Sequence, residues 1–185
     1  ASNGQKLGLL RQLLDDGAIA ELRSDDDRLR AYLAAVRLLA LRPRSRDEIE
    51  RDLRTKQYEA PVVEAAVERL MTEGLIDDVE FARFWSEDRT AFRPRGTRAL
   101  RYELRLKGVA NEDMAPALAA VDEDEAAWSA VARKAESWRN LPEDEFQQKV
   151  LGFLARRGFG YPTARGVWKR LIEHEGGAWE GDEGP

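Results

Sequence analysis

Phe92-Arg-Pro-Arg-Gly96 repeats the pattern of Leu41-Arg-Pro-Arg-Ser45 at an offset of 51 residues, and this repetition decides the fold. The apolar positions that follow both segments agree at the same offset, for example Leu53 with Leu104. A further offset of 50 carries the pattern from Leu104 to Leu154. A pattern that recurs at a nearly constant period indicates copies of one structural unit. The sequence therefore predicts three units of about fifty residues each.

Each unit contains three apolar stretches at helical spacing, separated by Pro or Gly. In the first unit, Ser45 and Glu48 have the spacing of a capping box, and Pro61 fits the first turn of a third helix. In the second unit, Phe81, Phe84 and Trp85 are expected to share one helix face, and Asn111 is expected to cap the third helix. Helices are predicted over 27–41, 45–57, 61–73, from 77 onward, 97–107, 111–121, from 124 onward, 143–157 and 162–173.

The predicted fold is therefore all-α, with three tandem three-helix repeats that resemble helix-turn-helix units. We expect a partly helical N-terminal extension over 1–25 and repeats over 26–76, 77–121 and 122–175. Residues 176–185 are rich in Gly and acids, so we expect a disordered tail there.

The composition excludes several classes of protein. The 185 residues include no cysteine, which excludes disulfides, thiolate catalysis and metal sites built on cysteine. There is no apolar run of membrane-spanning length and no signal segment, so we expect a cytoplasmic protein without a membrane partner. The net charge of −5 argues against indiscriminate coating of nucleic acid.

The residues that usually carry catalysis form no active-site pattern. The single histidine, His174, lies between two glutamates at an expected helix end. The acidic clusters 25–27, 77–78 and 122–125 all fall at expected helix starts, where capping and the helix dipole explain them. We therefore expect no enzyme activity, no cofactor and no metal site.

The segment Arg89–Lys107 carries seven basic residues against one acid, Glu103. On a helix over 97–107, three arginines form one stripe opposite two leucines that face the core. The candidate partner-binding residues are Arg93, Arg95, Arg98, Arg101, Arg105 and Lys107. Such a surface suits a phosphate backbone or an acidic protein face, and the alternative is a solvated helix face balanced by acids elsewhere. Residues 122–185 hold nine basic and thirteen acidic side chains, which favours a protein partner or a composite surface of protein and DNA.

Several of these segments, in this order and spacing, resemble the RecX family of regulators of the RecA recombinase. They are Gly74-Leu-Ile-Asp-Asp78 with Phe81-Ala-Arg83, Arg95-Gly-Thr-Arg98 with Glu103-Leu-Arg-Leu-Lys-Gly-Val109, and Leu151-Gly-Phe-Leu-Ala-Arg-Arg-Gly-Phe159. The resemblance covers about residues 29–173. In the first unit, Gln57 stands where the family usually has glycine, and we expect this to alter that helix end slightly.

The resemblance implies an elongated, curved array of repeats that lies in the groove of a filament of RecA on single-stranded DNA. It implies a protein that binds RecA and this filament and inhibits filament growth, ATPase, strand exchange and co-protease activity. Such a protein acts in recombination, DNA repair and the SOS response, and we expect the chain to be a monomer. Because the chain is net negative, we expect its direct DNA binding to be weak.

A helix-turn-helix regulator that reads DNA directly is the main alternative. A recognition helix normally presents Arg, Asn or Gln near its start. The third helices of the first two units instead start near Glu59 and Pro61 or near Glu112 and Asp113. This pattern disfavours a sequence-specific reader of DNA.

Overall fold

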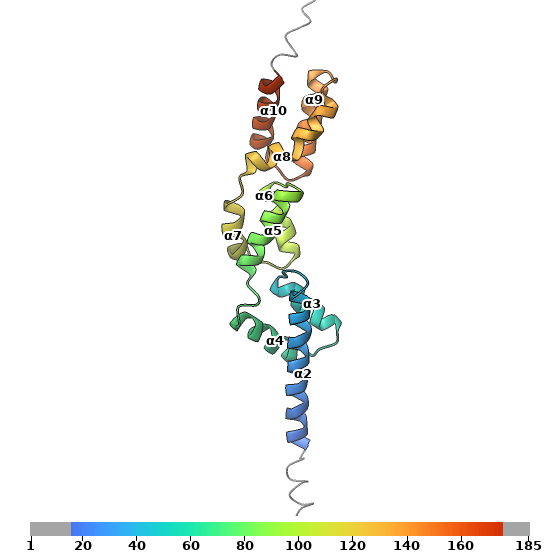
Figure 1. Cartoon of the computed structure of the whole chain (residues 1–185), viewed down its shortest axis with the longest axis vertical. Coiled ribbons are helices and arrows are strands. Elements are labelled where there is room, and N and C mark those ends of the chain that lie inside the picture. Colours follow the sequence, from blue (N-terminus) through green and yellow to red (C-terminus); the bar gives the residue numbers. More distant parts are fainter. Residues whose placement is uncertain (1–15, 176–185) are drawn as a thin grey trace, which may run out of the picture. The chain divides into compact units, whose positions relative to one another are not determined.

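The computed structural model describes residues 16–175, and Figure 1 colours the chain along its sequence. This part of the chain forms nine α-helices and one short 3-10 helix and contains no strand, which confirms the all-α prediction. The chain divides into two compact units between Asp77 and Asp78. The expected tail over 176–185 and the first fifteen residues of the expected extension lie outside the described residues.

The first unit is a bundle of α2 (Asp16–Leu39), α3 (Arg46–Thr55) and α4 (Ala60–Thr72). The predicted capping box is confirmed at the start of α3. The backbone N–H of Glu48 donates to Ser45 Oγ at 3.2 Å, and the backbone N–H of Ser45 donates to Glu48 Oε2 at 3.4 Å. The bundle buries apolar residues from all three helices, namely Ala31, Ala35, Ile49, Leu53, Val62, Val63, Ala66, Val67 and Leu70, with Ile76 beyond them.

The start of α2 differs from the prediction of a helix beginning at Asp27. The helix begins at Asp16, so the acidic cluster 25–27 lies within it and does not cap it. Arg28 and Asp25 approach to 3.5 Å, and Arg30 and Asp26 to 2.8 Å, at the i,i+3 and i,i+4 spacings. Such pairs support a continuous helix, which explains why these acids do not mark its start.

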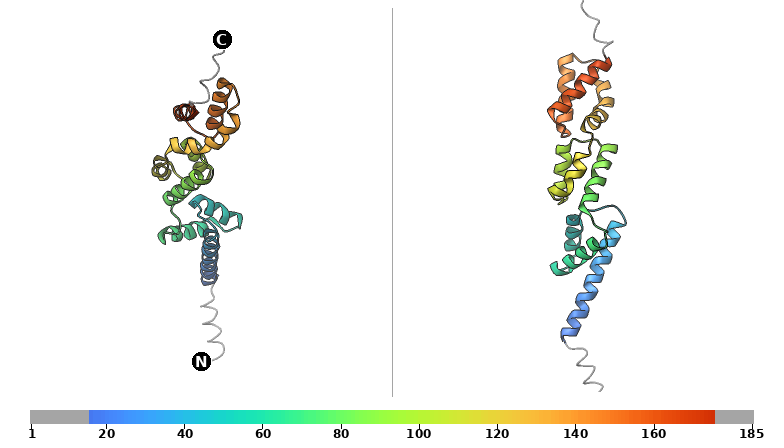
Figure 2. Two further views of the ribbon diagram at one scale, coloured as in Figure 1. Left: turned by 45° about the horizontal axis from the view of Figure 1, so that its top comes forward. Right: turned by 90° about the vertical axis from the view of Figure 1, so that its left-hand side faces the viewer.

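The second unit contains two bundles, which Figure 2 shows as two groups of helices. The first of them is formed by α5 (Asp78–Phe92), α6 (Thr97–Leu106) and α7 (Asn111–Ala119). The other consists of α8 (Glu123–Ala135), α9 (Glu143–Arg156) and α10 (Tyr161–Glu175), with the 3-10 helix η1 (Glu136–Trp138) after α8. Each bundle has its own core, the first around Leu100 and Leu104 and the second around Phe146 and Leu154.

The aromatic residues of α5 differ in how deeply they are buried. Phe81 is buried and stacks against Trp85 with ring centroids 6.0 Å apart, but the Phe84 side chain is 42% exposed. Phe84 comes two residues after the buried Ala82, which places it on nearly the opposite side of the helix from Ala82. Its side chain is therefore directed toward solvent. The three aromatic residues lie on one side of α5, as their spacing predicts, but Phe84 is at its exposed edge.

The second helix of every repeat ends in the same left-handed backbone turn. Gln57, Gly108 and Gly158 have φ angles of 66°, 76° and 87°. The turn lets the residue that follows close the helix end, as when the backbone N–H of Tyr58 donates to the Leu53 carbonyl at 3.3 Å. Gln57 thus keeps the geometry that glycine adopts in the other two repeats, and the expected alteration of this helix end is not seen.

Candidate partner-binding surface

Helix α6 separates its apolar and basic residues onto opposite sides. Leu100 and Leu104 are four residues apart and fully buried against α5 and α7. Arg98, Arg101 and Arg105 are exposed. This amphipathic division is the one that the helical spacing predicts.

Glu103, the only acid of α6, points toward α5 and away from the arginine stripe. Its Oε2 accepts hydrogen bonds from Trp85 Nε1 at 2.9 Å and from Arg89 Nε at 2.8 Å. Its Oε1 lies 3.0 Å from Arg95 Nε. The carboxylate therefore balances Arg89 and Arg95 and is oriented away from Arg101.

Arg95 has a structural counterpart in the first repeat. Arg44 pairs with Asp52 at the same sequence separation at which Arg95 pairs with Glu103. In both repeats the arginine precedes the second helix and the acid lies on that helix. The pair therefore ties the Pro-containing turn to the helix, so Arg95 has a role within the fold.

Lys107 and Arg105 also have intramolecular contacts. The Lys107 ammonium lies 4.3 Å from the centre of the Trp85 ring and 6.0 Å from that of Phe81, within cation–π range. Nε and Nη2 of Arg105 donate to Asn111 Oδ1 at 3.2 and 3.1 Å. Asn111 is the first residue of α7, and the residue at its cap position is Ala110, so the predicted capping role was wrong.

The side chains of Arg93, Arg98 and Arg101, the other candidate residues, differ in whether they contact the rest of the chain. Arg98 Nη2 donates to the backbone carbonyl of Ala155 on α9 at 3.2 Å, so this arginine bridges the two bundles of the second unit. The side chains of Arg93 and Arg101 are exposed, and neither forms an ion pair or a side-chain hydrogen bond within residues 16–175. The structure thus leaves Arg93 and Arg101 as the two cations that are most available to a partner.

The turn before α6 packs closely against the third bundle, which consists of α8, α9 and α10. We call this contact the joint, and the sequence did not predict it. The Gly96 N–H donates to the Arg157 carbonyl at 3.0 Å, and Arg157 Nη1 donates to the Pro94 carbonyl at 3.3 Å. A Cβ on Gly96 would lie 2.3 Å from the Gly158 carbonyl oxygen, so no larger residue fits. The signal was present in the repeat alignment, where Gly96 replaces the capping residue Ser45.

Helix α6 has Gly96 where α3 has the capping residue Ser45, and Glu123 of α8 takes over the role of the missing serine. The backbone N–H and the hydroxyl of Thr97 donate to the Glu123 carboxylate at 3.2 and 3.3 Å. An acid at a helix N-terminus satisfies a free N–H and interacts favourably with the helix dipole. The start of α6 is therefore stabilised by a residue of the next bundle.

Arg157 is the most enclosed cation of this joint. Burial lowers its pKa, and the positive charge of Arg95 lowers it further. Its guanidinium carbon also lies 4.6 Å from the centre of the Phe153 ring. Because an arginine pKa starts so high, the group stays charged at neutral pH and keeps its hydrogen bond to Pro94.

No group of three or more His, Asp or Glu side chains in the described part of the chain is placed to hold a metal ion. Nor does any described helix have both the length and the apolar character needed to cross a membrane. The side chain of His174 lies outside the described residues.

Comparison with known proteins matches all three repeats to one family. Models described as the first, second and third three-helix domains of RecX match residues 31–70, 77–118 and 122–168. Regulatory protein RecX of Streptomyces coelicolor is 34% identical over 181 residues, which cover 92% of this chain and 96% of that protein. Regulatory protein RecX of Prosthecochloris aestuarii is 34% identical over 149 residues, covering 80% and 98%.

Solved structures agree with these matches. A crystal structure of regulatory protein RecX superimposes with a TM-score of 0.76 at 25% identity, covering 84% of this chain and 80% of the other. The crystal structure of RecX from Lactobacillus salivarius gives a TM-score of 0.74 at 22% identity, covering 80% and 99%, and supports the fold.

Proposed function

Because the chain belongs to the RecX family, we propose that it acts as a non-enzymatic regulator of the RecA recombinase. In this proposal it binds RecA and the filament of RecA on single-stranded DNA in the cytoplasm. It inhibits filament growth and so lowers ATPase, strand-exchange and co-protease activity in recombination and the SOS response. The match of all three repeats to one family of regulatory proteins is the observation that carries the proposal.

The exposed arginines before and on α6 support a partner with negative charge. The side chains of Arg93 and Arg101 have no ion-pair or hydrogen-bond partner among the described residues, and the acid of α6 is used internally by Arg89 and Arg95. Cations of this kind bind acidic protein surfaces and phosphates. The acidic excess of residues 122–185 is repelled by the phosphates of bare DNA, which favours a protein partner or a composite surface of protein and DNA.

The first turns of the third helices support the choice of a protein partner over direct DNA reading. Helix α7 carries Glu112 and Asp113 in its first turn, and α4 has Pro61 there with Glu59 at its cap position. Acids at the start of such a helix repel phosphates and do not supply the usual contacts to bases. A role as a sequence-specific DNA reader is therefore not favoured.

The proposal is tested by measuring ATP hydrolysis by RecA on single-stranded DNA while the chain is titrated in. We expect inhibition at substoichiometric amounts, because one bound regulator that stops filament growth affects many RecA subunits. Cosedimentation with RecA alone, with DNA alone and with both identifies the partner in the same preparation. Unchanged hydrolysis over a wide titration, together with no cosedimentation with filaments, would rule the function out.

A further inference from the structure

The three repeats place equivalent residues where the first helix packs against the third. Each first helix has a buried pair four residues apart, and we align the three repeats on these pairs, namely Ala31 and Ala35 of α2, Ala82 and Ser86 of α5, and Ala127 and Val131 of α8. The third helices correspond in the same way, with Ala66, Ala117 and Val167 at one equivalent buried position. These core positions fix the register, so neighbouring surface residues can be compared one by one.

In the first and third repeats, a stacked pair covers the line between the first and third helices. The guanidinium carbon of Arg69 on α4 lies 3.9 Å from the centre of the Tyr32 ring on α2. That of Arg170 on α10 lies 4.0 Å from the centre of the Trp128 ring on α8. Each arginine also pairs with an acid, Arg69 with Glu73 at 2.8 Å and Arg170 with Glu125 at 3.2 Å. We call this aromatic and arginine pair the lid.

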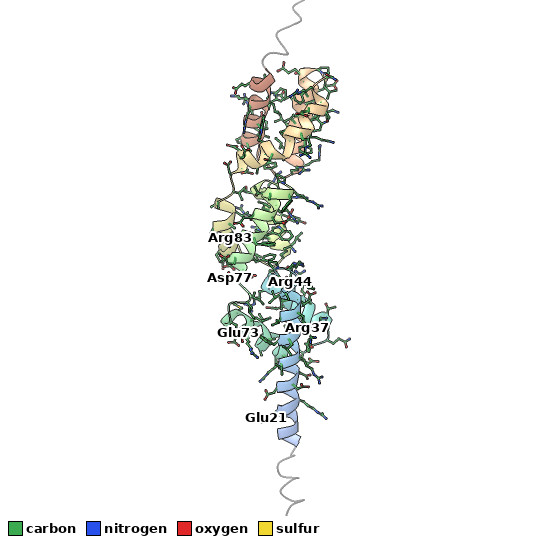
Figure 3. The ribbon with its side chains drawn as sticks, viewed as in Figure 1. Glu21, Arg37, Arg44, Glu73, Asp77 and Arg83 are labelled. Carbon is green, nitrogen blue, oxygen red and sulfur yellow. The ribbon has the colours of Figure 1, made fainter. Side chains whose placement is uncertain are left out.

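The middle repeat has no lid. Arg83 stands at the position of Tyr32 and Trp128, and Ala120 stands at that of Arg69 and Arg170. Arg83 instead forms ion pairs along its own helix, with Glu80 at 2.5 Å and with Glu87 at 3.1 Å. Figure 3 labels Arg83 on α5, and it also labels Glu73, the acid that pairs with Arg69 in the lid of the first repeat. A mainly apolar groove of about 550 Å³ remains between α5 and α7, and its lining includes Arg83, Ser86, Glu87, Ala117, Ala120 and Asp122.

One wall of this groove carries a buried hydroxyl without a partner. Ser86 is 3% exposed, and its Oγ has no hydrogen-bond partner among the described residues. The equivalent positions are Ala35 and Val131, so the hydroxyl is not needed to build a three-helix bundle. A buried polar atom without a partner is unfavourable and is normally satisfied by some group. The oxygen itself is covered, so Ser86 marks the floor of the groove and offers no exposed acceptor to an occupant.

The charges at the rim indicate what the occupant carries. Glu87 and Asp122 line the groove, and Glu80 adjoins Arg83, so acids outnumber the single arginine. Charge complementarity therefore favours a basic residue on the occupant. The lids of the other repeats show that an aromatic ring fits against the same helix pair, and Arg83 can stack on such a ring.

We propose that the groove between α5 and α7 binds a helical segment of a partner protein that supplies the missing lid. The segment inserts a Trp or Tyr side chain beside Arg83, where the other repeats have their own aromatic ring, and it places an arginine or lysine against Glu87 and Asp122. This inference goes beyond the proposed function, since it specifies the chemistry of the bound segment whichever protein carries it.

The experiment uses the full chain, labelled with ¹⁵N, and a blocked alanine-rich helical peptide with one Trp and, one turn later, one Arg. We expect peptide-induced shifts at the amides of Ser86, Ala117 and Ala120. Replacing the peptide Trp by Ala weakens binding by about tenfold or more, as expected for the loss of an aromatic anchor. Absence of shifts around the groove at any soluble peptide concentration would refute the proposal.

Two variants of the chain complete the test. Arg83→Trp combined with Ala120→Arg rebuilds the lid of the third repeat, and we expect it to stay folded and to lose peptide binding by tenfold or more. As a matched control, Arg133→Trp adds the same side chain at an exposed position of α8 and leaves binding unchanged. Equal peptide binding by the rebuilt-lid variant and the wild type overturns the proposal.

Discussion

At the scale of single residues, Gln57 is the clearest departure from the repeat. It adopts a φ of 66° where the other repeats place Gly108 and Gly158. A left-handed backbone brings the Cβ of an ordinary residue too close to the neighbouring carbonyl, and glycine avoids this contact. The first repeat therefore keeps its helix end in a conformation that is unfavourable for glutamine.

Gln57→Gly is expected to stabilise the chain by roughly 1 kcal/mol, because the left-handed strain is removed. Urea unfolding followed by circular dichroism measures the change in the free energy of unfolding. The reverse substitution at the equivalent position, Gly108→Gln, is expected to destabilise by a similar amount. If Gln57→Gly lowers stability, the helix end depends on contacts of the glutamine side chain instead.

The lid of the first repeat also makes a testable electrostatic prediction. Tyr32 donates to Glu73 Oε2 at 2.5 Å, and this hydrogen bond, with the one from Arg69, lowers the pKa of the Glu73 carboxyl. A lowered carboxyl pKa stabilises the fold above the ordinary glutamate pKa, and the contribution is lost as the pH falls through the lowered value. Tyr32→Phe is therefore expected to raise the pKa of Glu73.

An NMR titration of the Glu73 side-chain carboxyl measures this shift. Tyr102→Phe is the matched control, since Tyr102 is exposed and has no hydrogen-bond partner in the described part of the chain. It should leave the Glu73 titration unchanged. An unchanged Glu73 pKa in Tyr32→Phe would show that Arg69 alone holds the carboxylate.

At the scale of elements, the joint between α6 and the third bundle depends on two glycines. Gly96 and Gly158 approach so closely that a Cβ on either would lie within 2.5 Å of the other segment. Thr97 receives its cap from Glu123, and Arg98 reaches the Ala155 carbonyl. The second and third repeats are therefore fixed to each other by backbone contacts.

Gly96→Ala is expected to destabilise the second unit by roughly 1–3 kcal/mol, the usual range for forcing extra volume into a packed site. Thermal unfolding followed by circular dichroism measures this effect. Gly166→Ala is the matched control: a Cβ there meets no atom within 4 Å, and alanine favours its helix by about 1 kcal/mol. Equal melting temperatures for the two variants would contradict the proposed role of Gly96.

At the scale of the whole molecule, charge is unevenly distributed along a chain with a net charge of −5. Positive charge is concentrated between Arg89 and Lys107, yet internal contacts occupy most of these cations. Arg93 and Arg101 remain available, whereas Arg98 belongs to the joint. A test of partner binding should therefore change Arg93 and Arg101 and leave Arg98 in place.

Arg93→Glu combined with Arg101→Glu is expected to weaken inhibition of the RecA ATPase by tenfold or more, because two attractive contacts become repulsive. The helical circular-dichroism signal should be unchanged, since both side chains are exposed and neither forms an ion pair or a side-chain hydrogen bond within residues 16–175. Arg133→Glu with Arg165→Glu is the matched control, with the same change in net charge at exposed positions of the third repeat. If both double variants inhibit equally, Arg93 and Arg101 are solvated surface residues.

Much of the fold follows from short-range patterns. The capping box at Ser45 is local, so the sequence predicted it correctly. The acids 25–27 were misread because the same residues that cap a helix also pair with arginines within one. Sequence spacing alone does not separate these two uses.

The sequence by itself determined the three-helix repeats, because helical periodicity and the positions of Pro and Gly act within a few residues of the chain. Only the tertiary structure decided which arginines are free. The contacts of Arg95 with Glu103, of Lys107 with Trp85 and of Arg98 with Ala155 join different elements. It also decided that only the middle repeat lacks a lid, since cation–π contact requires residues from two helices to meet in space.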